Sequence, residues 1–140
     1  MQIILTECDI NIYLDIDGVL LGKEHGQVKL ASGVYEFLWK ALTEYKCFWL
    51  TTHCKGDSST ALKYMKKYCD EKTFKLIEKI QPSNFNVLKT DAIDFDSEFL
   101  WFDDFLLQSE IEVLHRKERL SSWIQIDTYK NFYDLRAFKF

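Results

Sequence analysis

The sequence is poor in residues that interrupt regular structure, and it lacks the patterns that place a chain in a membrane or an oxidising compartment. One proline and five glycines in 140 residues leave little material for a flexible linker. No apolar run approaches the ~20 residues of a membrane-spanning helix. The four cysteines form no C-x-x-C pair and follow no signal-peptide pattern. We therefore expect a cytoplasmic protein with free thiols that is not embedded in a membrane.

The sequence also lacks a general excess of positive charge. Its net charge of −4 does not attract polyanions to the whole surface, so a nucleic-acid substrate would require a local basic patch. Basic residues gather only at 63–67 and 116–119, in stretches of helical pattern where such runs are usually a solvated face. The adjacent His53 and Cys54 are a weak signal for zinc, because neighbouring residues rarely bind one metal and no second ligand pair is suitably spaced.

Apolar and aromatic residues, by contrast, are plentiful. They make up 47% and 16% of the chain, which is too much for a disordered protein. A length of 140 residues is common for one domain with its own hydrophobic core, and the sequence contains no internal repeat. We therefore expect residues 1–140 to form a single domain.

Short apolar runs alternate with helical patterns along the chain. Strands are expected at 2–5, 10–14, 47–50, 99–102 and 123–126. Helices are expected at 32–44, with Ser32 as its cap, and at 57–68, 71–79, 89–93 and 106–120. A small hairpin flap is expected within 20–30, with His25 as an exposed turn residue. The alternation predicts a three-layer α/β/α, Rossmann-like fold with a central, mainly parallel sheet.

Polar residues come directly after three of the expected strands. Each set alone has a structural explanation: a turn for Asp-x-Asp-Gly, a strand end for Thr-Thr and a solvated loop for Asp-Asp. In a parallel sheet, however, the three strand ends share one edge, where ligands of open α/β sheets bind. Carboxylates crowded there would repel one another unless a cation intervened, and their oxygens suit Mg²⁺. The residues are Asp15, Asp17, Thr51, Thr52, Asp103 and Asp104.

These motifs resemble, in order, those of the haloacid-dehalogenase-like phosphatases. IYLDIDGVL at 12–20 is similar to the family's first motif and WLTT at 49–52 to its second. Lys89 matches the third motif and WFDD at 101–104 the fourth, so the resemblance spans residues 10 to 127. The first, second and fourth motifs look closest to a branch found in polynucleotide-repair proteins.

The resemblance implies a magnesium-dependent phosphatase. Asp15 would attack phosphorus and form an aspartyl-phosphate, while Asp17 would protonate the leaving oxygen and later deprotonate water. Phosphate would be held by Lys89 and by Thr51 or its neighbour Thr52, of which Thr51 follows the apolar run directly. The resemblance assigns Mg²⁺ to Asp15, the Asp17 carbonyl, Asp103 and Asp104, with the roles of the last two open to exchange.

The spacing of the motifs predicts an uncapped site. The gaps from Asp17 to Thr51 and from Thr52 to Lys89 are too short for an inserted domain of ~50 residues or more. A phosphate on a macromolecule could then reach the site, as could a small molecule if oligomerisation supplied a lid. Three alternatives stay open: a catalytically inactive binding module, a phosphotransferase, and the less favoured dehalogenase, which needs no metal.

Overall fold

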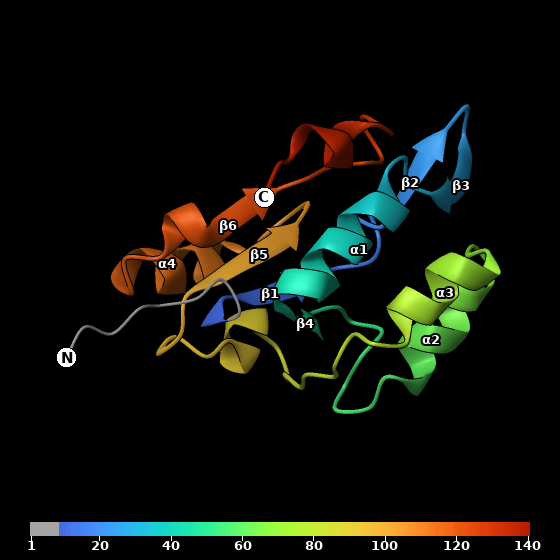
Figure 1. Ribbon diagram of the computed structural model, residues 1–140. Helices are drawn as coiled ribbons and strands as arrows, with labels where there is room; N and C mark the ends of the chain where they lie inside the picture. The colour runs from blue at the N-terminus through green and yellow to red at the C-terminus, as the bar shows by residue number, and fades with distance from the viewer. Residues whose placement is uncertain (1–8) are drawn as a thin grey trace.

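The computed structural model describes residues 9–140, which are built around a four-stranded parallel sheet (Figure 1). The strands lie in the order β4-β1-β5-β6, and every neighbouring pair is parallel. This confirms the predicted α/β class with a parallel central sheet. The strand expected at 2–5 lies outside the described residues. The sheet comprises β1 (Asn11–Leu14), β4 (Lys46–Trp49), β5 (Phe99–Asp103) and β6 (Trp123–Gln125).

Helices cover both faces of the sheet. Successive side chains of β1 point to opposite faces and therefore enter two different cores. Ile12 and Leu14 pack in one apolar cluster, which also holds the buried face of α1 (Val34–Glu44). Tyr13 packs in a second cluster on the other face, together with Leu114 of α4 (Gln108–Arg116). Burying each large apolar side chain is worth about 1.5–3 kcal/mol, so the three layers hold one another in place.

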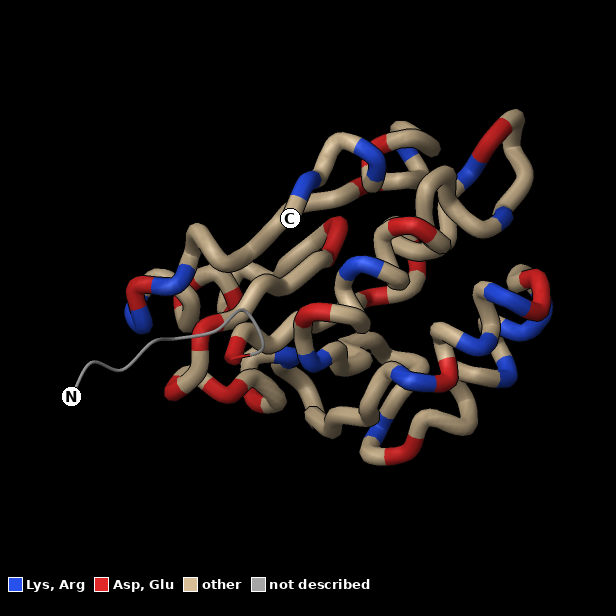
Figure 2. The backbone as a smooth tube through the Cα atoms, in the orientation of Figure 1, with Lys and Arg blue, Asp and Glu red and all other residues tan. Residues whose placement is uncertain are grey.

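Two further helices extend the first face. The helices α2 (Ser59–Lys66) and α3 (Glu71–Ile77) contribute Ala61, Met65 and Ile77 to the same cluster as α1. The basic residues of α2 are exposed, as the charge pattern predicts, and Figure 2 shows them with those of α3. Within residues 9–140, no helix has the length and apolar content needed to cross a membrane.

The helices begin and end inside the predicted ranges. The prediction that Ser32 caps the first helix is wrong: α1 begins after Gly33, whose φ is +88°, and the Ser32 hydroxyl accepts a hydrogen bond from Arg136 Nε at 2.5 Å. The stretch expected as a helix at 89–93 is a single 3₁₀ turn, Lys89–Ala92. A further 3₁₀ turn, Leu120–Ser122, begins at the last residue of the helix predicted at 106–120, and another, Asp134–Ala137, has no counterpart in the predicted elements.

The predicted hairpin is present as β2 (Leu21–Glu24) and β3 (Gln27–Leu30), which pair antiparallel. Its two turn residues, His25 and Gly26, both have positive φ, as the tight hairpin turn requires, and His25 is exposed as predicted. The base of the hairpin is fastened to the segment after β6. Buried Thr128 donates its hydroxyl to the Leu21 carbonyl at 2.7 Å, and its own carbonyl accepts the Lys23 N–H at 3.1 Å.

Candidate functional site

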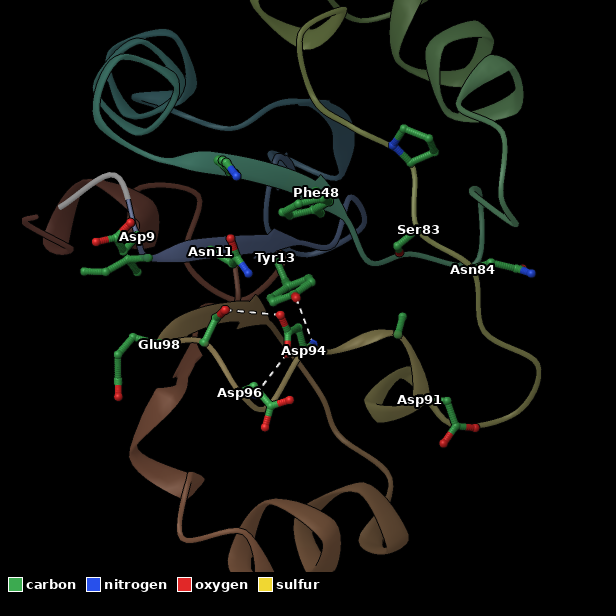
Figure 3. A pocket seen from close by; sticks show the side chains of 15 residues that line it. Asp9, Asn11, Tyr13, Phe48, Ser83, Asn84, Asp91, Asp94, Asp96 and Glu98 are labelled. Atoms are coloured by element: carbon green, nitrogen blue, oxygen red, sulfur yellow. Dashed lines mark hydrogen bonds between the residues drawn. The ribbon is translucent and has the colours of Figure 1, made fainter. Parts of the chain in front are cut away.

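A cavity of about 1170 Å³ lies at the edge of the sheet where the strands begin, away from the predicted site (Figure 3). Asn11 and Lys46, the first residues of β1 and β4, line it. Its loop wall is acidic and includes Asp94, which accepts hydrogen bonds from the Asp96 N–H and the Ser97 hydroxyl. The charged groups that line this cavity are mainly carboxylates, which would repel a phosphate, so the cavity does not suit an anionic substrate.

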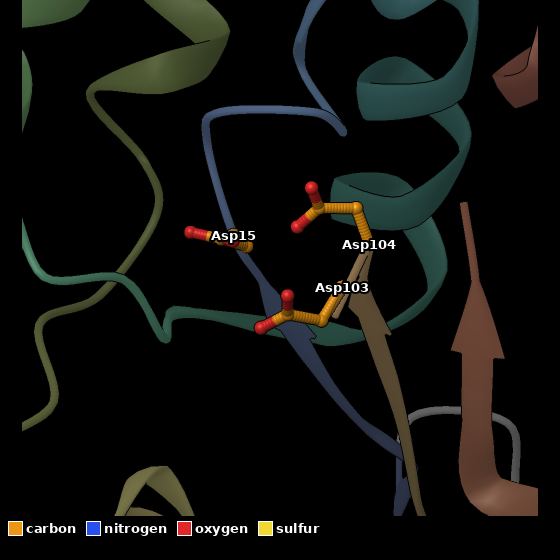
Figure 4. A group of neighbouring side chains, drawn as sticks. All are labelled: Asp15, Asp103 and Asp104. Carbon is orange, nitrogen blue, oxygen red and sulfur yellow. The ribbon is translucent and has the colours of Figure 1, made fainter. Parts of the chain in front are cut away.

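At the opposite edge of the sheet, three carboxylates converge as the strands end (Figure 4). Asp15 follows β1 and Asp103 is the last residue of β5, and the Asp15 N–H still donates to the Phe102 carbonyl at 3.1 Å. Each of Asp15, Asp103 and Asp104 offers an oxygen within 4.8 Å of the others. Within residues 9–140, this is the one group of three or more His, Cys, Asp or Glu side chains close enough to share a metal ion.

The Lys89 ammonium lies between two of these carboxylates. Its Nζ is 2.7 Å from Asp103 Oδ2 and 3.4 Å from Asp15 Oδ2. Burial opposes the charge on Lys89, but the two carboxylates outweigh that effect and raise its pKa. The two carboxylates therefore favour the charged form of Lys89, which the 3₁₀ turn before β5 brings to the site.

When all three carboxylates are ionised, the cluster carries more negative charge than Lys89 neutralises. Burial, together with the Asp15 charge, raises the pKa of Asp103 to about 8, although Lys89 and the Phe105 N–H act in the opposite direction. Burial also raises the pKa of Asp104, and the charges of Asp15 and Asp127 add to that effect. A cluster of this kind gains from a further cation, and its all-oxygen donor set suits a hard divalent metal.

The turn after β1 brings the first motif against this cluster. Gly18 has a φ of +82°, and a Cβ built on it would lie 2.6 Å from Asp104 Oδ2. No side chain larger than hydrogen fits without moving that carboxylate. The Gly18 N–H donates to the Leu21 carbonyl at 3.0 Å, and the Gly18 carbonyl accepts the Thr128 N–H at 2.9 Å. The Asp-x-Asp-Gly sequence therefore forms a turn that backbone hydrogen bonds to Leu21 and Thr128 hold in place.

Asp17 directs its carboxylate to three residues that the sequence did not single out for this role. The Tyr64 hydroxyl donates to Asp17 Oδ1 at 2.7 Å, and the Tyr129 hydroxyl donates to the same oxygen at 3.2 Å. His53 Nε2 lies 2.8 Å from Asp17 Oδ2, and the His53 ring stacks on Tyr64 with centroids 4.1 Å apart. Burial and the neighbouring Asp17 raise the pKa of both phenols, to about 12 for Tyr129, so both act as donors.

The two threonines of the second motif differ in their surroundings. The Leu50 N–H donates to the Leu14 carbonyl at 2.8 Å, so β4 ends beside β1 and brings Thr51 to the same edge. Thr51 is buried, and its hydroxyl accepts the His53 N–H at 3.4 Å. Thr52 is exposed. Thr51 is thus buried at this edge of the sheet, whereas its neighbour Thr52 is exposed to solvent.

The adjacent His53 and Cys54 side chains have separate partners. Cys54 Sγ lies 3.5 Å from the Ser83 carbonyl, whereas the His53 ring lies against Asp17. Among the described cysteines, Cys47, Cys54 and Cys69 are unpaired, as predicted.

Comparison with known proteins adds no identification. No known protein family, curated protein or solved structure matches this chain.

Proposed function

We propose that the chain is a magnesium-dependent phosphatase of the haloacid-dehalogenase-like class, which hydrolyses phosphomonoesters through an aspartyl-phosphate on Asp15. The observation that carries this proposal is the position of Lys89 Nζ, 2.7 Å from Asp103 and 3.4 Å from Asp15, within a cluster of three carboxylates. An ammonium beside a nucleophilic carboxylate would offset the charge repulsion between that carboxylate and an approaching anionic phosphate. The motifs of the sequence support the same function.

The charge and chemistry of the donors fit Mg²⁺. When ionised, the three carboxylates and Lys89 together leave two negative charges, which a divalent cation would balance. Asp15, Asp103, Asp104 and the Asp17 carbonyl are the proposed ligands, and both acids of the fourth motif belong to the set. The metal would supply charge neutralisation for the phosphoryl oxygens.

The proposed reaction has two steps. First, an Asp15 oxygen bonds to phosphorus while the bond to the leaving oxygen breaks, and Asp17 gives that oxygen its proton. Next, water attacks phosphorus and gives a proton to Asp17, which frees Asp15 and inorganic phosphate. Thr51 and Lys89 hold the phosphoryl oxygens throughout. The hydroxyls of Tyr64 and Tyr129 would keep the Asp17 carboxylate oriented between the two steps.

The substrate is proposed to be a phosphate ester whose size is not limited by a cap domain. Sequence spacing leaves no room for such a domain, and the elements after the first motif are the hairpin β2–β3 and then α1. A phosphorylated macromolecule, a nucleic-acid end included, and a small metabolite both fit this proposal. The unpaired cysteines agree with the cytoplasm as its proposed location.

Hydrolysis of an aryl phosphate with and without Mg²⁺ tests the function. We expect turnover with Mg²⁺, none after chelation, and recovery when Mg²⁺ is returned. Asp15→Asn should abolish turnover without unfolding the protein, as judged by circular dichroism. Activity that survives exhaustive chelation would refute the metal. Activity that survives Asp15→Asn would refute the nucleophile. No turnover by the wild-type protein on a broad ester panel would favour the binding module.

A further inference from the structure

Glu110 is a buried carboxylate that binds two separate loops of the site. It lies on the first turn of α4 and is 3% exposed. Its Oε2 accepts the backbone N–H of Lys89 at 2.7 Å, and its Oε1 accepts the backbone N–H of Leu107 at 2.8 Å. Hydrogen bonds to a buried charged acceptor are among the strongest in proteins, and losing the acceptor leaves both donors unsatisfied.

One of the two loops joined by Glu110 carries Lys89, which holds phosphoryl oxygens in the proposed reaction, and the other follows Asp103, a proposed metal ligand. Lys89 begins the 3₁₀ turn Lys89–Ala92, which has no side-chain cap of its own at Leu88. Leu107 lies in the loop after β5, where Asp103 Oδ1 accepts the Phe105 N–H at 3.1 Å. The Lys89 side chain adds a second link, because its Nζ reaches Asp103, the last residue of β5, at 2.7 Å. Glu110 thus fixes the backbone from which the Lys89 ammonium extends.

We propose that Glu110 is the positioning residue that holds Lys89 between Asp15 and Asp103. This inference rests on the proposed function, in which Lys89 binds the phosphoryl oxygens. Because a displacement of ~1 Å at a catalytic group can cost on the order of 10²-fold in rate, releasing this backbone should matter to chemistry. Glu110 itself lies behind the site and acts through Lys89.

An ordinary helix cap makes the matched control. Asp70 caps α3, accepting the Thr73 N–H at 2.9 Å, and its side chain is exposed. Asp70→Ala therefore removes a hydrogen bond between a carboxylate and a backbone N–H at the start of a helix, without changing either of the loops that Glu110 joins. Glu110→Gln keeps the shape of the side chain but replaces one acceptor oxygen with a donor that faces an N–H.

The test is a double-mutant cycle read out by the binding of inorganic phosphate in the presence of Mg²⁺, measured by calorimetry. We expect Glu110→Gln to weaken phosphate binding by about tenfold, which is a coupling within the usual range. In a Lys89→Met background, the same change should weaken binding no further. Asp70→Ala should leave phosphate affinity unchanged in both backgrounds. With an aryl phosphate, Glu110→Gln should lower kcat/KM by roughly 10²-fold.

Equal loss of phosphate affinity with and without Lys89 would overturn the inference, because Glu110 would then be a structural cap. No loss of phosphate affinity in Glu110→Gln would overturn it as well. If Glu110→Gln does not fold, Leu107→Pro removes the N–H that donates to Glu110 Oε1. Leu107 already has the φ of proline, −64°. Unchanged phosphate affinity in that variant would count against the proposal equally. If the wild-type protein hydrolyses no ester, the proposed function fails. The Lys89 Nζ–Asp103 distance in crystals of Glu110→Gln then judges the positioning role alone.

Discussion

Substituting Gly18 with alanine should destabilise the protein and displace Asp104 at the same time. A residue with a Cβ is strained at a φ of +82°, by roughly 1–2 kcal/mol. The new Cβ would also lie 2.6 Å from Asp104 Oδ2 and 2.7 Å from its Cγ, closer than real Cβ atoms approach. Overpacking of this kind costs roughly 1–3 kcal/mol. We expect the free energy of unfolding to fall by about 2–5 kcal/mol in total.

Gly26→Ala separates the two contributions. Gly26 has a nearly identical φ of +78°, but nothing lies within 4 Å of the place where its Cβ would be. This variant should therefore show the backbone strain alone, roughly 1–2 kcal/mol. The difference between the two variants, roughly 1–3 kcal/mol, then measures the contact with Asp104.

Urea unfolding of both variants gives these free energies, and Mg²⁺ titration of activity tests the site. Gly18→Ala should need more Mg²⁺ for half-maximal activity, whereas Gly26→Ala should match the wild type. Equal destabilisation by the two substitutions, with equal Mg²⁺ dependence, would refute the argument that Gly18 is required by its approach to Asp104.

The remaining predictions concern proton transfer and burial. Asp17→Asn should accumulate a phosphoenzyme with an aryl phosphate, seen by mass spectrometry as one added phosphoryl group. General acid–base assistance is worth ~10²–10⁴ in rate, and its loss should fall mainly on the water step; a variant that turns over at the wild-type rate would exclude this role. Tyr64→Phe removes the closest donor to Asp17 and should lower kcat by about tenfold. The matched control Tyr68→Phe, whose ring packs edge-on against Tyr64, should not; equal effects would indicate packing alone. Burial raises the pKa of Cys47 to about 12 and of Cys69 to about 11, so iodoacetamide at pH 8 should alkylate half-buried Cys69 before Cys47. Labelling of Cys47 before Cys69, detected by peptide mapping, would contradict the burial of Cys47.

The strands and the polar residues that end them could be predicted from the sequence because each depends on local pattern. Apolar runs such as 99–102 fill both cores, and the acids beyond them meet because parallel strands end at one edge. The prediction for Ser32 failed for a local reason. Gly33 takes the left-handed conformation at the start of α1, and Ser32 pairs instead with Arg136 from the other end of the chain.

The partners of Asp17 could not be predicted in the same way. His53 stands two residues after Thr51, which is a usable signal, but Tyr64 lies on α2 and Tyr129 comes after β6. Their meeting at one carboxylate depends on the tertiary packing of three distant segments. Glu110 could not be recognised for another reason. On an amphipathic helix it looks like any solvated acid, and only its burial between two loops distinguishes it.

The attachment of the hairpin to Thr128 has a consequence for how the protein is made. A ribosome synthesises Asp15, Asp17 and the hairpin well before the groups that fasten them. Thr128 holds the base of the hairpin and the Gly18 turn, and its neighbour Tyr129 reaches Asp17. A nascent chain that has emerged only through β5 therefore contains Asp15 and much of its sheet, but neither Thr128 nor Tyr129. The anchored form of the Gly18 turn and Asp17 should therefore appear abruptly, when the segment after β6 leaves the exit tunnel.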